Sequence, residues 1–151
     1  MQLSNNGLNL IKQSEECELK AYLDSAGIRT IGWGIIVYPN GQHVKEGDVI
    51  TQQQADQYLT YQVNLKTSEL NPMLKSTINQ NQYDALVDFC YNVGTGGFAG
   101  STLRRLVNTN PSDPAIKVAF EMWDKEHVDG ELIVSKGLLA RRKKEAQLYF
   151  S

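Results

Sequence analysis

The stretch EECELKAYLDSAGIRTIGWG, residues 15–34, decides the fold that the sequence predicts. It passes from an amphipathic helical pattern into a turn that contains Gly27 and then into the β-prone run 28–33, which predicts a helix followed by a small hairpin. Glu15, Asp24 and Thr30 all lie within this short passage. Two carboxylates and a hydroxyl brought so close together are the side chains that general acid–base catalysis requires.

The helical pattern places Glu15 on the inner face of the first helix. At about 100° per residue, Leu8, Ile11 and Leu19 share one face, and Glu15 falls in the middle of it. Burial raises the pKa of a carboxyl group, which suits a general acid. Asp24 follows in the turn, so we expect it to be better hydrated and to remain ionised. Two carboxylates in such unlike environments indicate an acid and a base, the pair that hydrolysis of a glycoside uses.

Spacing alone leaves a structural interpretation open. A glutamate on an apolar helix face is often half of a structural ion pair, and an aspartate before Ser-Ala-Gly often only forms a turn. Further motifs extend the pattern along most of the chain: VKEGDVIT at 44–51, QNQYDAL at 80–86, NVGTG at 92–96, STL at 101–103, and Gly137-Leu138 ahead of Arg141-Arg142.

Together with the run from Ile11 to Gly34, these motifs resemble, in order, those of the phage-type muramidases of glycoside hydrolase family 24. The resemblance implies that Glu15 is the general acid, that Asp24 positions or activates water, and that Thr30 helps to hold that water. It implies as substrate the β-1,4 bond between N-acetylmuramic acid and N-acetylglucosamine of peptidoglycan, cleaved with inversion. A protein of this family is expected to be an endolysin that lyses the host cell of a phage.

Positions beside the family motifs supply candidates for sugar contacts: Gly34, Phe89, Asn92, Ser101 and Thr102. Three other positions depart from the family pattern. The family commonly has an aromatic residue at Ser14, a glycine at Glu16 and a histidine at Ile35. None of these departures removes a catalytic residue, but Ser14 and Glu16 lie beside the acid, where they are placed to alter its burial and hence its pH optimum.

Composition and capping signals predict one domain over residues 1–151, α+β and mostly α, and the resemblance implies that this domain is catalytic. With 41% hydrophobic and 21% charged residues, the chain is long and apolar enough for a real core. The resemblance adds a lysozyme-like fold, with a small hairpin-containing lobe over about 12–50, a bridging helix over about 51–70 and a helical lobe over about 72–151. Helix starts are expected at two capping boxes and one Asp-Pro pair, with helices from there to the end of the chain: Thr51 with Gln54, Asn79 with Gln82, and Asp113-Pro114, whose helix runs to Trp123.

The basic run 141–144 has two interpretations. Glu145 balances its charge and the other face of the same helix is apolar, so a solvated face is the default. The sharper hypothesis is that Arg141 or Arg142 reaches the cleft and hydrogen-bonds Glu15. Such a partner lowers the pKa of the acid against the effect of burial.

We expect few partners other than peptidoglycan glycan strands. A net charge of −2 gives little attraction to nucleic acid. The resemblance implies no cofactor, and His43 and His127 have no metal-ligand spacing around them, so we predict no metal. Cys17 and Cys90 are expected to be free thiols that serve in packing.

The sequence also bears on where the protein works. No window reaches the roughly 18 apolar residues of a membrane span, and the first residues lack the basic and apolar regions of a secretory signal. We therefore expect a monomer that is held in the host cytoplasm before release and acts on the peptidoglycan layer. Such an enzyme needs a separate, holin-type membrane protein to reach the wall.

Two other functions stay open at this point. A lytic transglycosylase needs the glutamic acid but no water-activating carboxylate, because a hydroxyl of the sugar itself closes an anhydro ring. A non-catalytic peptidoglycan-binding module keeps the groove but has no need of Glu15, Asp24 and Thr30 together.

Overall fold

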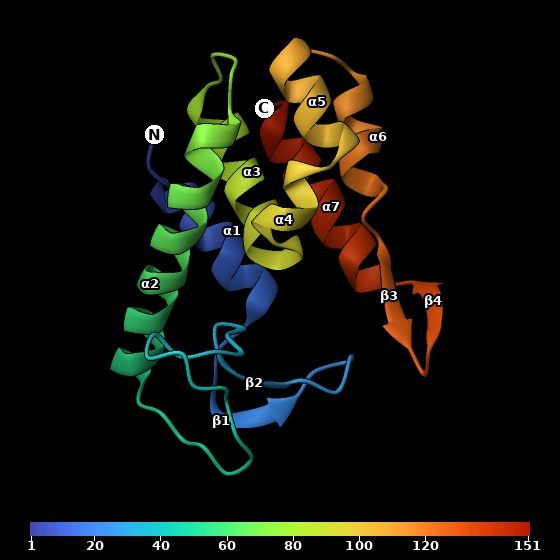
Figure 1. Cartoon of the computed structure of the whole chain (residues 1–151). Coiled ribbons are helices and arrows are strands. Elements are labelled where there is room, and N and C mark those ends of the chain that lie inside the picture. The colour runs from blue at the N-terminus through green and yellow to red at the C-terminus, as the bar shows by residue number, and fades with distance from the viewer.

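The structure is a computed structural model that describes residues 1–151. Figure 1 shows helices gathered at one end of the molecule and the first hairpin, with its long following loop, at the other. The fold is α+β and mostly helical, as the sequence predicts. In chain order its elements are α1 (Asn5–Glu15), β1 (Glu18–Leu23), β2 (Arg29–Gly32), α2 (Gln52–Leu70), η1 (Asn71–Met73), α3 (Gln80–Val93), α4 (Thr95–Ala99), α5 (Thr102–Thr109), α6 (Ala115–Glu121), β3 (Lys125–Val128), β4 (Glu131–Val134) and α7 (Lys136–Tyr149).

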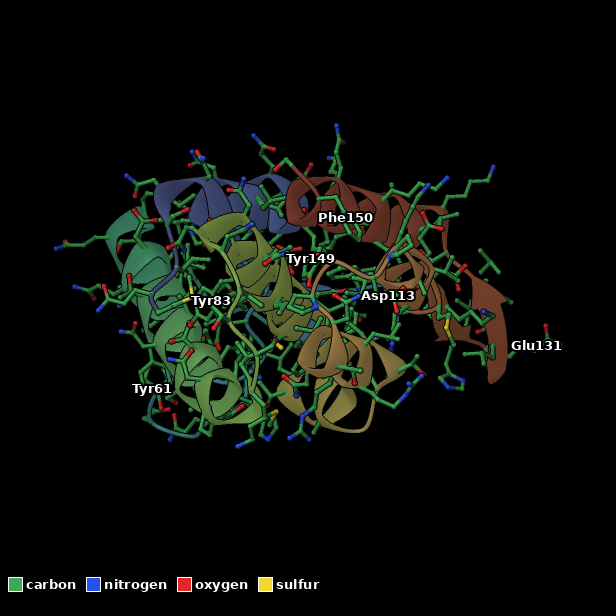
Figure 2. All side chains as sticks on the ribbon, turned by 90° about the horizontal axis from the view of Figure 1, so that it is seen from above. Tyr61, Tyr83, Asp113, Glu131, Tyr149 and Phe150 are labelled. Carbon is green, nitrogen blue, oxygen red and sulfur yellow. The ribbon has the colours of Figure 1, made fainter.

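The larger of two hydrophobic cores surrounds α3, which packs against α1, α2 and α7. Every residue of α3 from Tyr83 to Cys90 is buried, so this helix is the centre of the helical end. Figure 2 shows Tyr83 and Tyr149 lying among the helices, whereas Tyr61 and Glu131 lie at the outside. A helix enclosed on all sides can present polar groups only to partners inside the protein, which matters for the site described below.

A second, small core lies beneath the β1–β2 hairpin. It consists of Ile31, Ile35, Val44, Ile50 and Ala55. Because Ala55 is in α2, the first turns of α2 belong to the small core, while Leu59, Val63 and Leu70 of the same helix pack in the large one. Helix α2 therefore connects the two ends of the molecule, as Figure 1 shows.

Both predicted capping boxes are present. The Thr51 side chain accepts a hydrogen bond from the backbone of Gln54, whose side chain accepts one from the backbone of Thr51, and Asn79 and Gln82 do the same at α3. Each box satisfies backbone N–H groups that a helix start leaves unpaired. At α6 the Asp113 side chain accepts from the N–H of Ala115 at 2.8 Å, so the Asp-Pro signal is also confirmed.

Two expectations about secondary structure are wrong. Helix α1 ends at Glu15, so Leu19 is not on its face but lies in β1 and is 37% exposed. The reason is the conformation of Glu16, whose φ of 53° and ψ of 153° turn the chain out of the helix. Pairing with β2 then decides the strand conformation of residues 18–23.

The second error is the β3–β4 hairpin, where the sequence predicts only helices. Asp129 and Gly130 both have positive φ, 51° and 80°, and lie between paired strands in which Val128 faces Glu131. An Asp-Gly pair is the residue choice for a two-residue hairpin turn of this kind, so a signal was available in the sequence. No helix of the chain is both long and apolar enough to cross a membrane.

The backbone at Glu16 generates the first prediction. A non-glycine residue at this φ and ψ is strained, and glycine is the residue that the family commonly has here. We expect Glu16→Gly to raise the free energy of unfolding by about 1 kcal/mol, measured by urea denaturation. Glu18→Gly in the extended strand β1 is the control, since it should lower that free energy by about 0.5–1 kcal/mol. A loss of stability in both variants would contradict the prediction.

Candidate active site

A cleft of about 530 Å³ lies between the β1–β2 hairpin and the helices. Glu15, Asp24 and Thr30 all line it, together with Gly34 and Asn92. The end of α1, the β1–β2 turn, the start of β2, the loop after β2 and the end of α3 supply these residues. The three residues that the sequence singles out for chemistry are therefore brought together in one cavity.

Glu15 is the last residue of α1, and its side chain is only 16% exposed. Burial is the largest influence on it and raises the pKa of its carboxyl, while the nearby Arg141 guanidinium acts in the opposite direction. The net direction is upward. A glutamic acid that keeps its proton above the usual range is suited to protonating a leaving group.

Arg141, on α7, is the residue that contacts Glu15. Its Nη1 donates a hydrogen bond to Oε1 of Glu15. Its Nε and Nη2 donate to the two oxygens of Asp88 at 3.0 and 2.9 Å. Arg141 therefore makes the hydrogen bond to Glu15 that the sharper hypothesis expects, although it does not itself line the cleft and the net pKa of Glu15 still rises.

Arg142 has a different role from the one proposed for it. It is fully buried, donates to Oε1 of Glu145 at 2.7 Å and lies 5.1 Å from the centre of the Phe89 ring. A solvated face, the default expectation for this run, is wrong for both arginines and holds only for the exposed Lys143 and Lys144. Charge balance in the sequence could not show this, because it does not say which side of α7 faces the core.

Asp88 is a site residue that the sequence reasoning missed. It is fully buried on α3, within the same helix as apolar residues such as Leu86 and Val87. The available signal was a carboxylate on a helix whose neighbouring residues are apolar. Such a carboxylate is buried away from water and therefore needs a buried cationic partner. Arg141 is that partner.

Asp24 is half-buried in the turn between β1 and β2. Its Oδ1 accepts hydrogen bonds from the N–H groups of Ala26 and Ile28, at 2.9 and 2.8 Å. Asp24 therefore forms the turn, as the structural interpretation holds, and also lines the cleft. Because Oδ1 takes both backbone bonds, Oδ2 is the oxygen left for water or substrate.

Thr30 is 4% exposed and its Oγ1 donates to the carbonyl of Ile28 at 2.9 Å. A hydroxyl whose proton is engaged in this way offers its lone pairs to a water in the cleft. The β1–β2 pairing sets Thr30 opposite Tyr22, which also lines the cavity.

The five candidates for sugar contacts are divided by the structure. Gly34 and Asn92 line the cleft. Phe89 does not, because it is fully buried among Phe98, Phe120 and Trp123 in the large core. Ser101 caps α5 and, with Thr102, borders a separate cavity of about 430 Å³. Motif neighbours lie on both sides of a helix, so closeness in sequence could not separate cleft positions from core positions.

Other residues that line the cleft were not among the candidates. They are Tyr22, Ile28, Ile35, Ile36, Val37, Gln62, Lys66, Tyr91, Val93 and Gly94. Tyr91 donates a 2.6 Å hydrogen bond to the carbonyl of Trp33, which fixes the loop just before Gly34 to α3. Burial first, and the charge of Glu15 second, raise the pKa of the Tyr91 hydroxyl, so it stays a hydrogen-bond donor.

Gly34 lies directly against the acid. Its φ is +83°, and a Cβ added to it would collide with Oε2 of Glu15. Glycine is required on both grounds, the left-handed backbone and the close approach of a carboxylate. No group of three or more His, Cys, Asp or Glu side chains is placed to hold a metal ion. Cys17 and Cys90 are free, Cys90 in the large core.

Residues 12–145 match the phage lysozyme family. The chain belongs to the phage lysozyme family. Over 151 residues it is 36% identical to the endolysin of Salmonella phage P22, a match that covers 100% of this chain and 99% of that endolysin.

Solved structures agree with this assignment. The endolysin from Escherichia coli O157:H7 phage FAHEc1 superposes with a TM-score of 0.92 at 41% identity, covering 100% of this chain and 94% of that one. The muramidase domain of SpmX from Asticaccaulis excentricus superposes with a TM-score of 0.82 at 28% identity, covering 99% and 98%. The protein is thus a glycoside hydrolase of the lysozyme type, and its resemblance to the phage-type muramidases is confirmed.

The contact of Gly34 with Glu15 generates a prediction for this lysozyme. Gly34→Ala must displace the Glu15 carboxyl, and we expect wall-lysing activity to fall by about 100-fold. Gly41→Ala is the matched control, because Gly41 has nearly the same φ, +86°, but no atom within 4 Å of an added Cβ. Both variants should lose about 1 kcal/mol of stability, and only the first should lose activity. Equal activities in the two variants, assayed by turbidity of stripped cell walls, would contradict this reading of the contact.

Proposed function

We propose that this lysozyme hydrolyses the β-1,4 bond between N-acetylmuramic acid and N-acetylglucosamine in peptidoglycan, with Glu15 as the general acid. The observation that carries the proposal is the pairing of a largely buried Glu15, whose pKa is raised, with a half-buried Asp24 in the same cleft. Two carboxyl groups in unlike environments are the acid and the base of a glycoside hydrolase.

In the proposed mechanism Glu15 gives its proton to the glycosidic oxygen as the bond to the sugar carbon breaks. A water molecule held by Oδ2 of Asp24 and Oγ1 of Thr30 attacks that carbon and passes a proton to Asp24. The new carbon–oxygen bond replaces the broken one, and the protons exchange with solvent before the next turnover. Attack from the face opposite the leaving group gives inversion, as the family resemblance implies.

Two observations favour hydrolysis over the alternatives. A lytic transglycosylase has no use for Asp24, yet the turn holds its carboxylate toward the cleft with two backbone hydrogen bonds. A wall-binding module has no use for a glutamic acid whose pKa is raised by burial next to an arginine, since burying this group costs stability without aiding binding. The reducing or anhydro character of the product ends separates hydrolysis from transglycosylation.

Two parts of the proposal rest on the sequence. One is that a holin-type membrane protein releases the enzyme from the host cytoplasm to the wall, causing lysis of the cell. The other is that the enzyme works as a monomer, without cofactor or nucleic acid.

The test compares wild type with Glu15→Gln, Asp24→Asn and the control Glu16→Gln, which neutralises the exposed neighbour of the acid. Turbidity loss of stripped cell walls and new reducing ends are measured in the same tubes. We expect Glu15→Gln to lower both rates by about three orders of magnitude, Asp24→Asn by about two, and Glu16→Gln by less than about twofold. Thermal unfolding of each variant confirms that it is folded.

Other outcomes would overturn the proposal in identifiable ways. Activity that survives in folded Glu15→Gln removes Glu15 from the role of acid. Anhydro product ends in wild type make the enzyme a transglycosylase. Wall binding without any lysis in wild type makes the protein a binding module.

A further inference from the structure

A cluster of five charged side chains lies behind the cleft, inside the helical end. It consists of three carboxyl groups, Glu15, Asp88 and Glu145, and two guanidinium groups, Arg141 and Arg142. Asp88, Glu145 and Arg142 are fully buried, and the Arg141 side chain is 8% exposed. Burying so many charges is costly unless each one is paired, so the arrangement calls for a reason beyond stability.

The geometry around Arg141 gives that reason. Both oxygens of Asp88 accept hydrogen bonds from Arg141, from Nη2 at 2.9 Å and from Nε at 3.0 Å. This two-point grip fixes the plane of the guanidinium and leaves Nη1 as the edge that meets Oε1 of Glu15. Asp88 thus determines where the nitrogen that contacts the acid lies.

The contact between Arg141 and Asp88 also affects the pKa of Glu15. An arginine alone beside a glutamic acid favours the ionised form and lowers the pKa of the carboxyl. Here Arg141 lowers the pKa of Glu15, whereas the negative charge of Asp88 raises it. Because the charge of Asp88 partly offsets that of Arg141, Arg141 can orient Glu15 while lowering the pKa of its carboxyl less than an unpaired arginine would.

We propose that Asp88 is a positioning residue of the reaction: it grips and neutralises Arg141, so that Arg141 orients Glu15 without depriving it of the proton that it donates. The inference rests on the proposed role of Glu15 as general acid. It assigns to α3 a contribution to catalysis from outside the cleft, because Asp88 is fully buried and does not line the cavity.

The other titratable groups near Glu15 and Asp88, inside the cluster and around it, are unchanged in the comparison below. On α7, Glu145 pairs with Arg142 and is close enough to Asp88 to be affected by its charge, and burial is the main cause that raises the pKa of Glu145 well above the usual range. From β1 and α3, the hydroxyls of Tyr22 and Tyr91 lie near enough to Glu15 to feel its charge. Asp24 and Lys66 line the cleft itself.

Helix α3 supplies a matched control one turn earlier. Asp84 is also fully buried, but it accepts hydrogen bonds from the N–H of Ser4 at 3.0 Å and from Gln80 at 2.8 Å. It therefore ties the start of α1 to α3 and does not contact an arginine. Asp84→Asn perturbs the same helix at the same depth without touching the pair of Arg141 and Glu15.

The experiment measures kcat/KM on stripped cell walls against pH for wild type, Asp88→Asn and Asp84→Asn. Activity requires a protonated Glu15, so the fall of activity on the alkaline side reports the pKa of that acid. We expect Asp88→Asn to move this fall toward lower pH by about one unit, which is about a tenfold loss at alkaline pH. Asp84→Asn should lower the unfolding temperature and leave the position of the fall unchanged.

A double variant keeps the test decisive if Asp88→Asn fails to fold. In Asp88→Asn/Arg141→Gln both charges are absent, and burial acts on Glu15 with only Arg142 left to lower its pKa, so the alkaline fall should lie above that of wild type. Replacing a buried pair as a whole is tolerated better than removing one partner. NMR titration of the Glu15 carboxyl gives the same ordering without an activity assay.

The inference is overturned if activity of Asp88→Asn falls at the same alkaline pH as that of wild type, or if Asp84→Asn shifts this pH equally. It is also overturned if activity of the double variant falls at the same pH as that of wild type or at a lower one. These results differ from a failure of the proposed function, which Glu15→Gln reports. If Glu15→Gln is inactive but Asp88→Asn has the pH profile of wild type, Asp88 has no positioning role and Glu15 is still the acid.

Discussion

The buried guanidinium of Arg141 is the constraint on which the arrangement of the site depends. It comes from α7, near the end of the chain, and joins Glu15 at the end of α1, 126 positions away, to Asp88 in the centre of α3. A buried arginine left without its carboxylates is strongly destabilising, so the three helices have one low-energy arrangement at this point. The same pairs that hold α1 and α7 against α3 thereby fix the acid at the edge of the cleft.

The two carboxyl groups of the site differ because two different levels of structure place them. Asp24 is held by hydrogen bonds to N–H groups only two and four residues further along the chain, so a local turn suffices. Glu15 depends on partners that arrive from α3 and α7. Local placement leaves Asp24 half-buried, while tertiary packing buries most of Glu15. Unequal burial of two carboxyl groups is what allows one to act as acid and the other to serve the water.

The sequence predicted what local hydrogen bonds decide. The capping boxes at Thr51 and Asn79, the Asp-Pro helix start and the turn holding Asp24 each rest on atoms a few residues apart, and all are present. It missed one local signal, the Asp129-Gly130 turn of the β3–β4 hairpin, and its errors about side chains lie where packing decides. Phe89 lies beside a family motif but points into the core, and the side of α7 that is buried carries Arg141 and Arg142 rather than only apolar residues. A run of basic residues in the sequence does not indicate which of them pairs with a buried carboxylate in the fold.

Local rules are broken at two points near the acid. Glu16 takes a backbone conformation suited to glycine, and Asp88 puts a charge inside the most enclosed helix. Each of these choices lowers stability on its own. Elsewhere the helix caps and the two hydrophobic cores follow the ordinary preferences. A buried pair of Asp88 and Arg141 beside one carboxyl group is expected where selection acts on chemistry, since a stability optimum would put apolar residues at 88 and 141.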